Sequence, residues 1–428
     1  MPSFIFSDLE NIFTMNAQTH KKTDMIKGFI FALTLLGASV FFSVYSLLGK
    51  TYEGSESSPA YIVYMIMMLA LEMIIFLLNG KFTRKQFFWL LVPLAFVLLA
   101  WLFSLAYSMS VNISIIRNAI LWQYTGILLA FNINYSKVDK YIGKSLVVLM
   151  FMITFGSVFN VLIPYIQGSS MLLFKSSFSS VGSSFQAQSY YIAYAAGINL
   201  FFFCANAREM LTKIISYMLL GIQFLCAILY AGRGAMVLAL IYLVLYFLYM
   251  NNEKKISSKK VLSLLFYVLV ILAMYVIIRR MIDSSNVLQG RFERVFSYIG
   301  SGGIDLSQTS NRDSLYPIAL KYILASPAFG YGILGYMYLD GLNRYPHNFV
   351  LEFLIEGGII YMILWICIIF RGIKRIKIIR NLDIYKVCLV TGLFAFIKLS
   401  FSATYSYEML FWFFVVFSNI CKREVLLE

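Results

Sequence analysis

His347 is the side chain of this sequence best placed to transfer a proton. It is followed by Asn348 and by a strongly apolar stretch that begins at Phe349, and Arg344 lies shortly before it. Histidine titrates near neutral pH, and the only other histidine in the chain is His20. Asn348 can orient a hydroxyl or a phosphate oxygen. A histidine that only packs against the next helix, or caps it, is the alternative explanation.

Arginine supplies the second chemical signal. A guanidinium forms paired, fixed hydrogen bonds with phosphate, so two or three arginines together could hold a pyrophosphate. Arg233 stands between Gly232 and Gly234, which let the backbone come close to a ligand and leave the side chain accessible. The competing explanation for such arginines is contact with lipid headgroups. The candidates for substrate binding are Arg117, Arg233, Arg291, Arg312 and Arg344.

Charged residues also occur inside apolar segments. Glu352 and Glu356 are one helical turn apart, so they share one face of the helix that follows His347. Lys398 and Glu408 flank a short turn and are expected to form a structural ion pair. A charge within a membrane is costly and usually faces a cavity or a partner. We therefore expect Glu352 and Glu356 to face a cavity or a partner.

The composition indicates what kind of protein must position these residues. Hydrophobic residues make up 61% of the 428 residues and charged residues only 13%, whereas soluble domains have about half and about a quarter. We therefore predict an all-α polytopic membrane protein that forms a single domain, 1–428. Twelve apolar windows are long enough to cross a bilayer, at about 20 residues each: 26–48, 60–79, 87–109, 115–133, 145–166, 190–206, 214–231, 235–250, 261–278, 349–370, 387–401 and 404–420.

The basic residues predict the orientation of the chain. Most of the 35 Lys and Arg residues fall in the short segments on one side, which is then the cytoplasmic side and holds both termini. On this topology, residues 1–25 form a cytoplasmic N-terminal segment and residues 279–348 form one long external loop with short helices. The net charge of +15 is thus a topology signal and not a nucleic-acid footprint.

The long loop has two predicted features of its own. A helix is expected to follow Arg312, with an apolar face formed by Leu315, Ile318, Ala319, Tyr322 and Ile323 and a stop at Ser326–Pro327. The glycines of the segment 330–335 predict a loop that can approach a ligand closely. A loop of this length in a compact protein is usually functional.

Missing motifs narrow the chemistry. The sequence has no Walker loop, no Asp-x-Asp pair for a metal-held nucleotide sugar, no histidine cluster and no Gly-x-Ser-x-Gly element. A transferase built on this chain is therefore expected to use a pre-activated donor, with no metal and no cofactor.

Five short motifs occur in order in the second half of the chain: Gly232–Gly234, Asn311–Arg312, Ser326–Gly332, His347–Asn348 and Glu356–Gly357. As a set, they resemble the O-antigen ligase and polymerase superfamily of bacterial envelope glycosyltransferases, and His347 and Gly357 reproduce its pattern of histidine, nine residues and glycine. The motifs cover roughly 230–360, and the topology covers the whole chain. The Arg-x-x-x-Leu element of the ligases is not reproduced at Arg312.

The resemblance implies a metal-independent, inverting glycosyl transfer at the outer face of the bacterial inner membrane. The donor would be an oligosaccharide on undecaprenyl pyrophosphate, whose diphosphate is both handle and leaving group. Arg233 and Arg312 would bind the diphosphate, with Arg117 as a further candidate, and His347 would accept the proton of the acceptor hydroxyl. Asn348 and Glu352 would position it. Membrane lipids and a chain-length regulator protein are further candidate partners.

Three functions fit these observations. A polymerase, which we favour because the ligase element is missing at Arg312, joins lipid-linked repeat units to one another. A ligase transfers the finished chain to lipid A–core. A lipid-linked oligosaccharide flippase is the third, but transporters usually show internal repeats, and none is visible in this sequence.

Overall fold

The computed structural model describes residues 22–47, 59–80, 82–107, 113–135, 139–166, 182–230, 232–250, 299–300, 303–304, 312–342, 345–379 and 381–421. Within these ranges the chain is helical except for one short hairpin, in which β1 (Ile299–Gly300) pairs antiparallel with β2 (Gly303–Ile304). The predicted ninth span, Arg291, Arg344 and the side chain of Arg312 lie outside the described part of the chain.

The helices follow the predicted apolar windows. In the described residues, seven helices are long and apolar enough to cross a membrane, or eight if one bent pair counts as a span. The total of twelve therefore stays a prediction. The main helices are α2 (Gly37–Leu47), α3 (Pro59–Asn79), α4 (Arg84–Ala106), α5 (Ile113–Tyr135), α6 (Asp139–Ser157), α9 (Gly182–Ile198), α10 (Met210–Leu229), α11 (Arg233–Met250), α14 (Arg312–Ala325), α15 (Phe349–Ile376), α16 (Leu382–Phe401) and α17 (Met409–Ile420).

Several predicted spans are less regular than expected. The first is not one continuous helix, because Lys22–Leu35 and Gly37–Val44 meet at 81°. Helix α6 continues into a π-helical turn, η1 (Val158–Leu162), and then α7 (Ile163–Ile166), while α9 continues into a second π-helical segment, η2 (Asn199–Cys204). The last window, 404–420, begins with a turn that contains η5 (Tyr405–Tyr407), so only 12 residues remain for α17.

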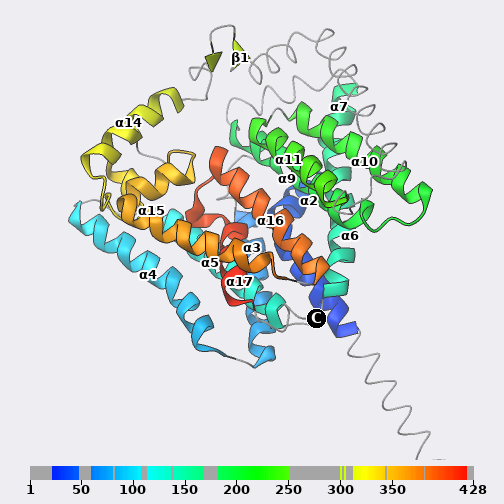
Figure 1. Ribbon diagram of the computed structural model, residues 1–428, viewed down its shortest axis with the longest axis horizontal. Helices are drawn as coiled ribbons and strands as arrows, with labels where there is room; N and C mark the ends of the chain where they lie inside the picture. The colour runs from blue at the N-terminus through cyan, green and yellow to red at the C-terminus, as the bar shows by residue number, and fades with distance from the viewer. Residues whose placement is uncertain are drawn as a thin grey trace, which may run out of the picture.

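Helices α5 and α17 form the centre of the molecule (Figure 1). Nearly every side chain of α17 is buried, as expected for a helix that is apolar on all sides. Gly126 lets α5 approach α17 closely, because a Cβ there would overlap the carbonyl oxygen of Met409. Helices α3 and α4 cover α5 on one side, and α9 packs with α6, α10, α11 and α16 on the other.

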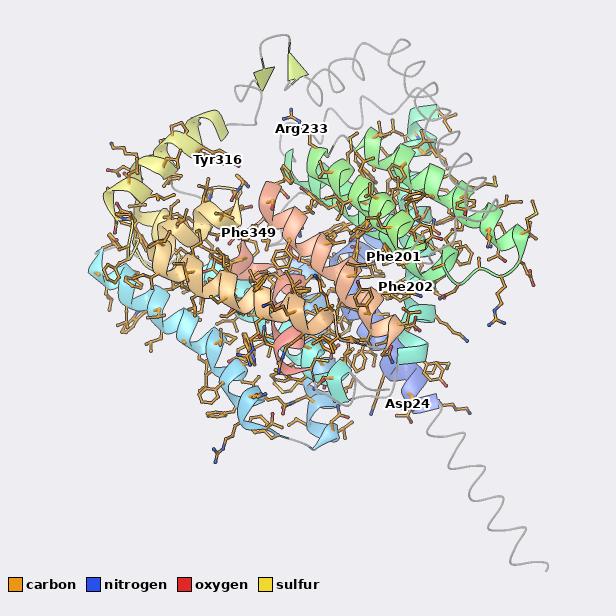
Figure 2. The ribbon with its side chains drawn as sticks, in the orientation of Figure 1. Asp24, Phe201, Phe202, Arg233, Tyr316 and Phe349 are labelled. Atoms are coloured by element: carbon orange, nitrogen blue, oxygen red, sulfur yellow. The ribbon has the colours of Figure 1, made fainter. Side chains whose placement is uncertain are left out.

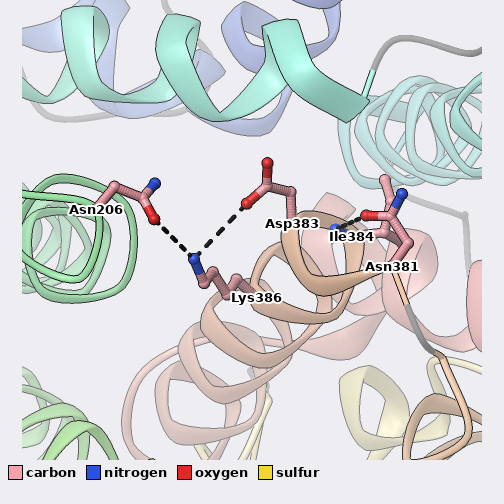
Figure 3. Close-up of polar contacts among 5 residues, drawn as sticks. All are labelled: Asn206, Asn381, Asp383, Ile384 and Lys386. Carbon is pink, nitrogen blue, oxygen red and sulfur yellow. Dashed lines mark hydrogen bonds and ion pairs between the residues drawn. The ribbon is translucent and has the colours of Figure 1, made fainter. Parts of the chain in front are cut away.

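A cluster of polar side chains lies at the start of α16, at one end of the molecule (Figure 3). Asn381 caps α16 by accepting a hydrogen bond from the Ile384 backbone N–H at 3.1 Å. Lys386 Nζ lies 3.6 Å from Asp383 Oδ1 and donates to Asn206 Oδ1 at 3.3 Å. These contacts fix α16 to the connection between η2 and α10.

The helix predicted within the long loop is confirmed as α14. Leu315 and Ala319 are buried, and Ile318, Tyr322 and Ile323 are half-buried, so the predicted apolar face is the one that packs inward. Helix α14 packs against α15, and its end at Ala325 agrees with the predicted stop.

Candidate functional site

His347 occupies a strained position directly before α15. Its backbone has φ 56°, in the left-handed region that non-glycine residues rarely adopt. The next residue, Asn348, caps α15, and its Oδ1 accepts hydrogen bonds from the backbone N–H groups of Val350 at 3.0 Å and Leu351 at 3.3 Å. The cap therefore fixes the start of α15 directly after His347, whose imidazole is half-buried.

The imidazole of His347 rests on an aromatic support. Its ring centroid lies 4.5 Å from that of Tyr345, edge to face. The Tyr345 hydroxyl in turn donates to the carbonyl oxygen of Ser402 at 3.4 Å, and its ring lies 6.3 Å from that of Tyr407. Both Ser402 and Tyr407 belong to the turn 402–408 between α16 and α17, so that turn positions the histidine.

The residue that precedes this turn, Phe401, lies against the start of α11. Helix α11 begins at Arg233, and a Cβ on Gly234 would lie 3.0 Å from Cβ of Phe401, the last residue of α16. Ser189 and Tyr190 of α9 also lie against Gly232 and Gly234 and leave no room for a Cβ there. The glycines therefore serve close helix packing, and this packing places Arg233 beside the end of α16.

Figure 2 places Arg233 and Tyr316 of α14 at the upper edge of the molecule, with Phe349 of α15 below them, toward the end opposite Asp24. Arg233 and the residue that follows the His347–Asn348 pair thus share one end of the bundle.

Helix α15 is broken inside its length at Gly357 and Gly358, which have non-helical backbone angles. The loop that follows α14 fills the break. Tyr331 N–H donates to the Ile355 carbonyl at 2.7 Å, Gly332 N–H donates to the Glu356 carbonyl at 2.7 Å, and Ile359 N–H donates to the Pro327 carbonyl at 2.8 Å. The glycine-rich loop predicted to approach a ligand therefore approaches α15.

Two buried carboxyl groups lie directly before this break. Glu352 is 0% exposed and accepts a hydrogen bond from the Thr404 hydroxyl. Glu356 is 1% exposed and accepts from the Tyr405 hydroxyl and, at 2.9 Å, from the Leu334 backbone N–H. Neither carboxyl forms an ion pair with any described residue. In this structure, Glu352 therefore contacts the turn 402–408, through Thr404, inside the protein.

Tyr336 is also buried, and it lies near the Glu352 and Glu356 carboxyl groups. Tyr336 lies in η4 (Gly335–Tyr338), outside the spanning helices. Burial, followed by the nearby Glu352 and Glu356 carboxyls, raises the pKa of its hydroxyl well above the usual range. Tyr336 therefore stays a neutral phenol over the physiological pH range.

The remaining candidates have different positions. Arg117 is exposed on the first turns of α5, and its Nε and Nη2 each lie 3.4 Å from Asn118 Oδ1. It is six residues, roughly 9 Å along a helix, from Gln123, whose amide donates to the Ser406 carbonyl at 2.8 Å. Arg312 is the first residue of α14. The predicted Lys398–Glu408 ion pair is confirmed at 2.7 Å.

Sequence reasoning missed the contribution of the turn 402–408. Thr404, Tyr405 and Ser406 are all buried, and each makes a hydrogen bond to another segment. The only sequence signal for such a role was a polar cluster between two apolar windows. Asn348 had a clearer signal as a helix cap, because asparagine directly before an apolar helix is a preferred N-cap.

The fold and site define an all-helical, multi-pass membrane protein with a histidine and an arginine near one end of its helix bundle. A family model described as O-antigen ligase matches residues 217–366. This match runs from α10 into α15 and agrees with the resemblance to the O-antigen polymerase and ligase superfamily, whose members are membrane glycosyltransferases. No curated protein and no solved structure matches the chain.

Proposed function

We propose that this protein is a polysaccharide polymerase of the bacterial inner membrane. It joins oligosaccharide repeat units carried on undecaprenyl pyrophosphate at the outer membrane face. The observation that carries the proposal is the turn 402–408. It supports His347 through Tyr345, and it follows Phe401, which packs against Gly234 at the start of α11.

The proposed reaction needs one base and one set of cations. His347 accepts the proton of the acceptor hydroxyl while that oxygen attacks the anomeric carbon of the donor sugar. The bond between this carbon and the diphosphate oxygen breaks, and the diphosphate leaves with the bonding electrons. Arg233 and Arg312 offset the growing negative charge. Attack from the face opposite the leaving group inverts the anomeric centre.

The other candidates take supporting roles in this proposal. Asn348 holds the chain at His347 by capping α15, and Glu352 fixes the turn 402–408 through Thr404. Arg117, Arg291 and Arg344 are proposed as further contacts for the phosphate groups or for the sugar chain. A chain-length regulator is proposed as a partner of the polymerase.

A ligase is the second candidate, because the matching family model is described as O-antigen ligase. The two functions share the donor and the leaving group, and they differ in the acceptor. A ligase would transfer the finished polysaccharide to lipid A–core.

The surface glycan profile of a strain that lacks the gene tests these functions. Loss of the long ladder, with core plus a single repeat retained, supports the polymerase. Loss of every capped species, with polymer accumulating on the lipid carrier, supports the ligase and contradicts the polymerase. Accumulation of single lipid-linked repeats at the cytoplasmic face contradicts both and indicates a flippase.

A further inference from the structure

We propose that Glu356 is a positioning residue that holds together the loop and the turn on which the two parts of the proposed site depend. Its contacts are a property of the fold, whereas its effect on turnover rests on the proposed function. No group on the substrate needs to touch it.

The hydrogen bonds of Glu356 join three segments. Its Oε1 accepts from the Leu334 backbone N–H at 2.9 Å, and its Oε2 accepts from the Tyr405 hydroxyl. The Tyr361 hydroxyl lies 3.1 Å from the Tyr405 hydroxyl, so it can extend this chain of donors to the second half of α15. Because the side chain is 1% exposed, both oxygens serve protein groups and not solvent.

The hydrogen bond from the Leu334 N–H to Glu356 fixes a strained backbone position. Leu334 has φ 59°, in the left-handed region, and it is 1% exposed. A non-glycine residue persists in that region only where its surroundings fix it. Leu334 also lies on the segment that leads from the end of α14 to Tyr345 and His347. Holding Leu334 therefore holds the chain that connects the Arg312 helix with the proposed base.

The hydrogen bond from the Tyr405 hydroxyl to Glu356 holds the turn 402–408 against α15. That turn supports Tyr345 through the Ser402 carbonyl, and it follows Phe401, which packs against Gly234, the residue after Arg233. One carboxyl group thus fixes the loop and the turn relative to each other. Loss of both hydrogen bonds should loosen the loop without removing any group that we place on the substrate.

The directions of these hydrogen bonds predict which substitutions are tolerated. In Glu356→Gln, the amide oxygen can accept from Leu334, and the amide nitrogen can donate to the Tyr405 hydroxyl, which then donates to Tyr361. Both links survive in this variant. Glu356→Ala removes both links, and Tyr405→Phe removes one of them.

The first measurement is backbone amide hydrogen exchange over residues 334–338 in the purified full-length protein. Because the buried Leu334 N–H loses its acceptor, we expect exchange at least about fivefold faster in Glu356→Ala. Glu356→Gln should exchange like the wild type. As a control, Tyr242→Phe removes another buried hydroxyl, which donates to the Val390 carbonyl at 2.6 Å, and should leave this segment unchanged. Unchanged exchange in Glu356→Ala would overturn the proposal.

The second measurement is turnover with a lipid-linked oligosaccharide. Because a misplacement of about 1 Å can reduce a rate about 100-fold, we expect kcat of Glu356→Ala to fall by about that factor with KM changed less than about twofold. Glu356→Gln should restore most of kcat. A Gln variant as inactive as the Ala variant would show that turnover does not depend on these two hydrogen bonds, and would contradict the positioning role.

Two further outcomes are informative. If Glu356→Ala does not accumulate in the membrane, Tyr405→Phe compared with Tyr242→Phe decides, since only the first should loosen residues 334–338. If the wild type shows no transfer activity, the proposed function fails, but the exchange measurement still tests the role of Glu356.

Discussion

At the scale of single residues, the backbone of His347 is as informative as its imidazole. A left-handed conformation of a non-glycine residue costs about 1–3 kcal/mol and is typical of functional sites. At His347 the Asn348 cap and the Tyr345 ring contact hold that conformation in place.

His347→Asn separates the backbone role from the chemical one. Asparagine tolerates the left-handed region but cannot accept a proton near neutral pH. We expect this variant to insert and unfold like the wild type while its turnover falls by about 100-fold to 10,000-fold, the usual contribution of a general base. His20→Asn is the control with unchanged turnover. Wild-type turnover in His347→Asn would remove the residue from the mechanism.

Arg233 should act through its geometry as well as its charge. Lysine keeps the positive charge but loses the paired hydrogen bonds to phosphate. We expect Arg233→Ala to abolish product and Arg233→Lys to retain a small part of the activity, measured with purified protein and lipid-linked donor. Arg208→Ala changes an exposed arginine in the connection before α10 and should retain full activity. Equal activity of the Arg233 and Arg208 variants would contradict the proposed role.

At the scale of elements, the loop after α14 depends on the break in α15, because its backbone forms hydrogen bonds with residues on both sides of that break. Gly358 has φ 64° and ψ −160°, a combination essentially limited to glycine, and a Cβ there would overlap the Ala328 carbonyl. We expect Gly358→Ala to lower the free energy of unfolding by about 2 kcal/mol or more. Thermal unfolding in detergent measures the change.

The chain offers a matched control for this substitution. Gly221 lies within α10, and a Cβ there would meet no other atom within 4 Å. Gly221→Ala should therefore be neutral or stabilise the protein by about 0.5–1 kcal/mol. If both alanine variants unfold at the wild-type temperature, the break does not need glycine.

Features that depend on local sequence could be predicted, and features that depend on distant pairing could not. The inward face of α14 follows from helical spacing alone, and the Lys398–Glu408 pair follows from two opposite charges beside one turn. The contact between Glu352 and Thr404 joins residues 52 positions apart, and no periodic pattern indicates it. For the same reason the fit of the 326–335 loop into the α15 break was missed.

At the scale of the whole molecule, two clusters of polar contacts lie at opposite ends of α16. Lys386, Asp383 and Asn206 cluster where α16 begins. The turn 402–408 and the loop before α15 cluster where α16 ends. Since α16 connects the two clusters, its direction through the bilayer decides on which side of the membrane the proposed site lies. The proposed lipid-linked substrate requires the outer side.

Labelling of introduced cysteines tests that orientation directly. Lys321 on α14 and Lys85 at the start of α4 are both exposed, and basic-residue bias places them on opposite sides. In a background that carries Cys367→Ala, which removes the exposed native thiol, a membrane-impermeant maleimide added to spheroplasts should label Lys321→Cys. It should label Lys85→Cys only after permeabilisation. The reverse pattern would place His347 in the cytoplasm, where a polymerase acting on translocated repeat units could not work.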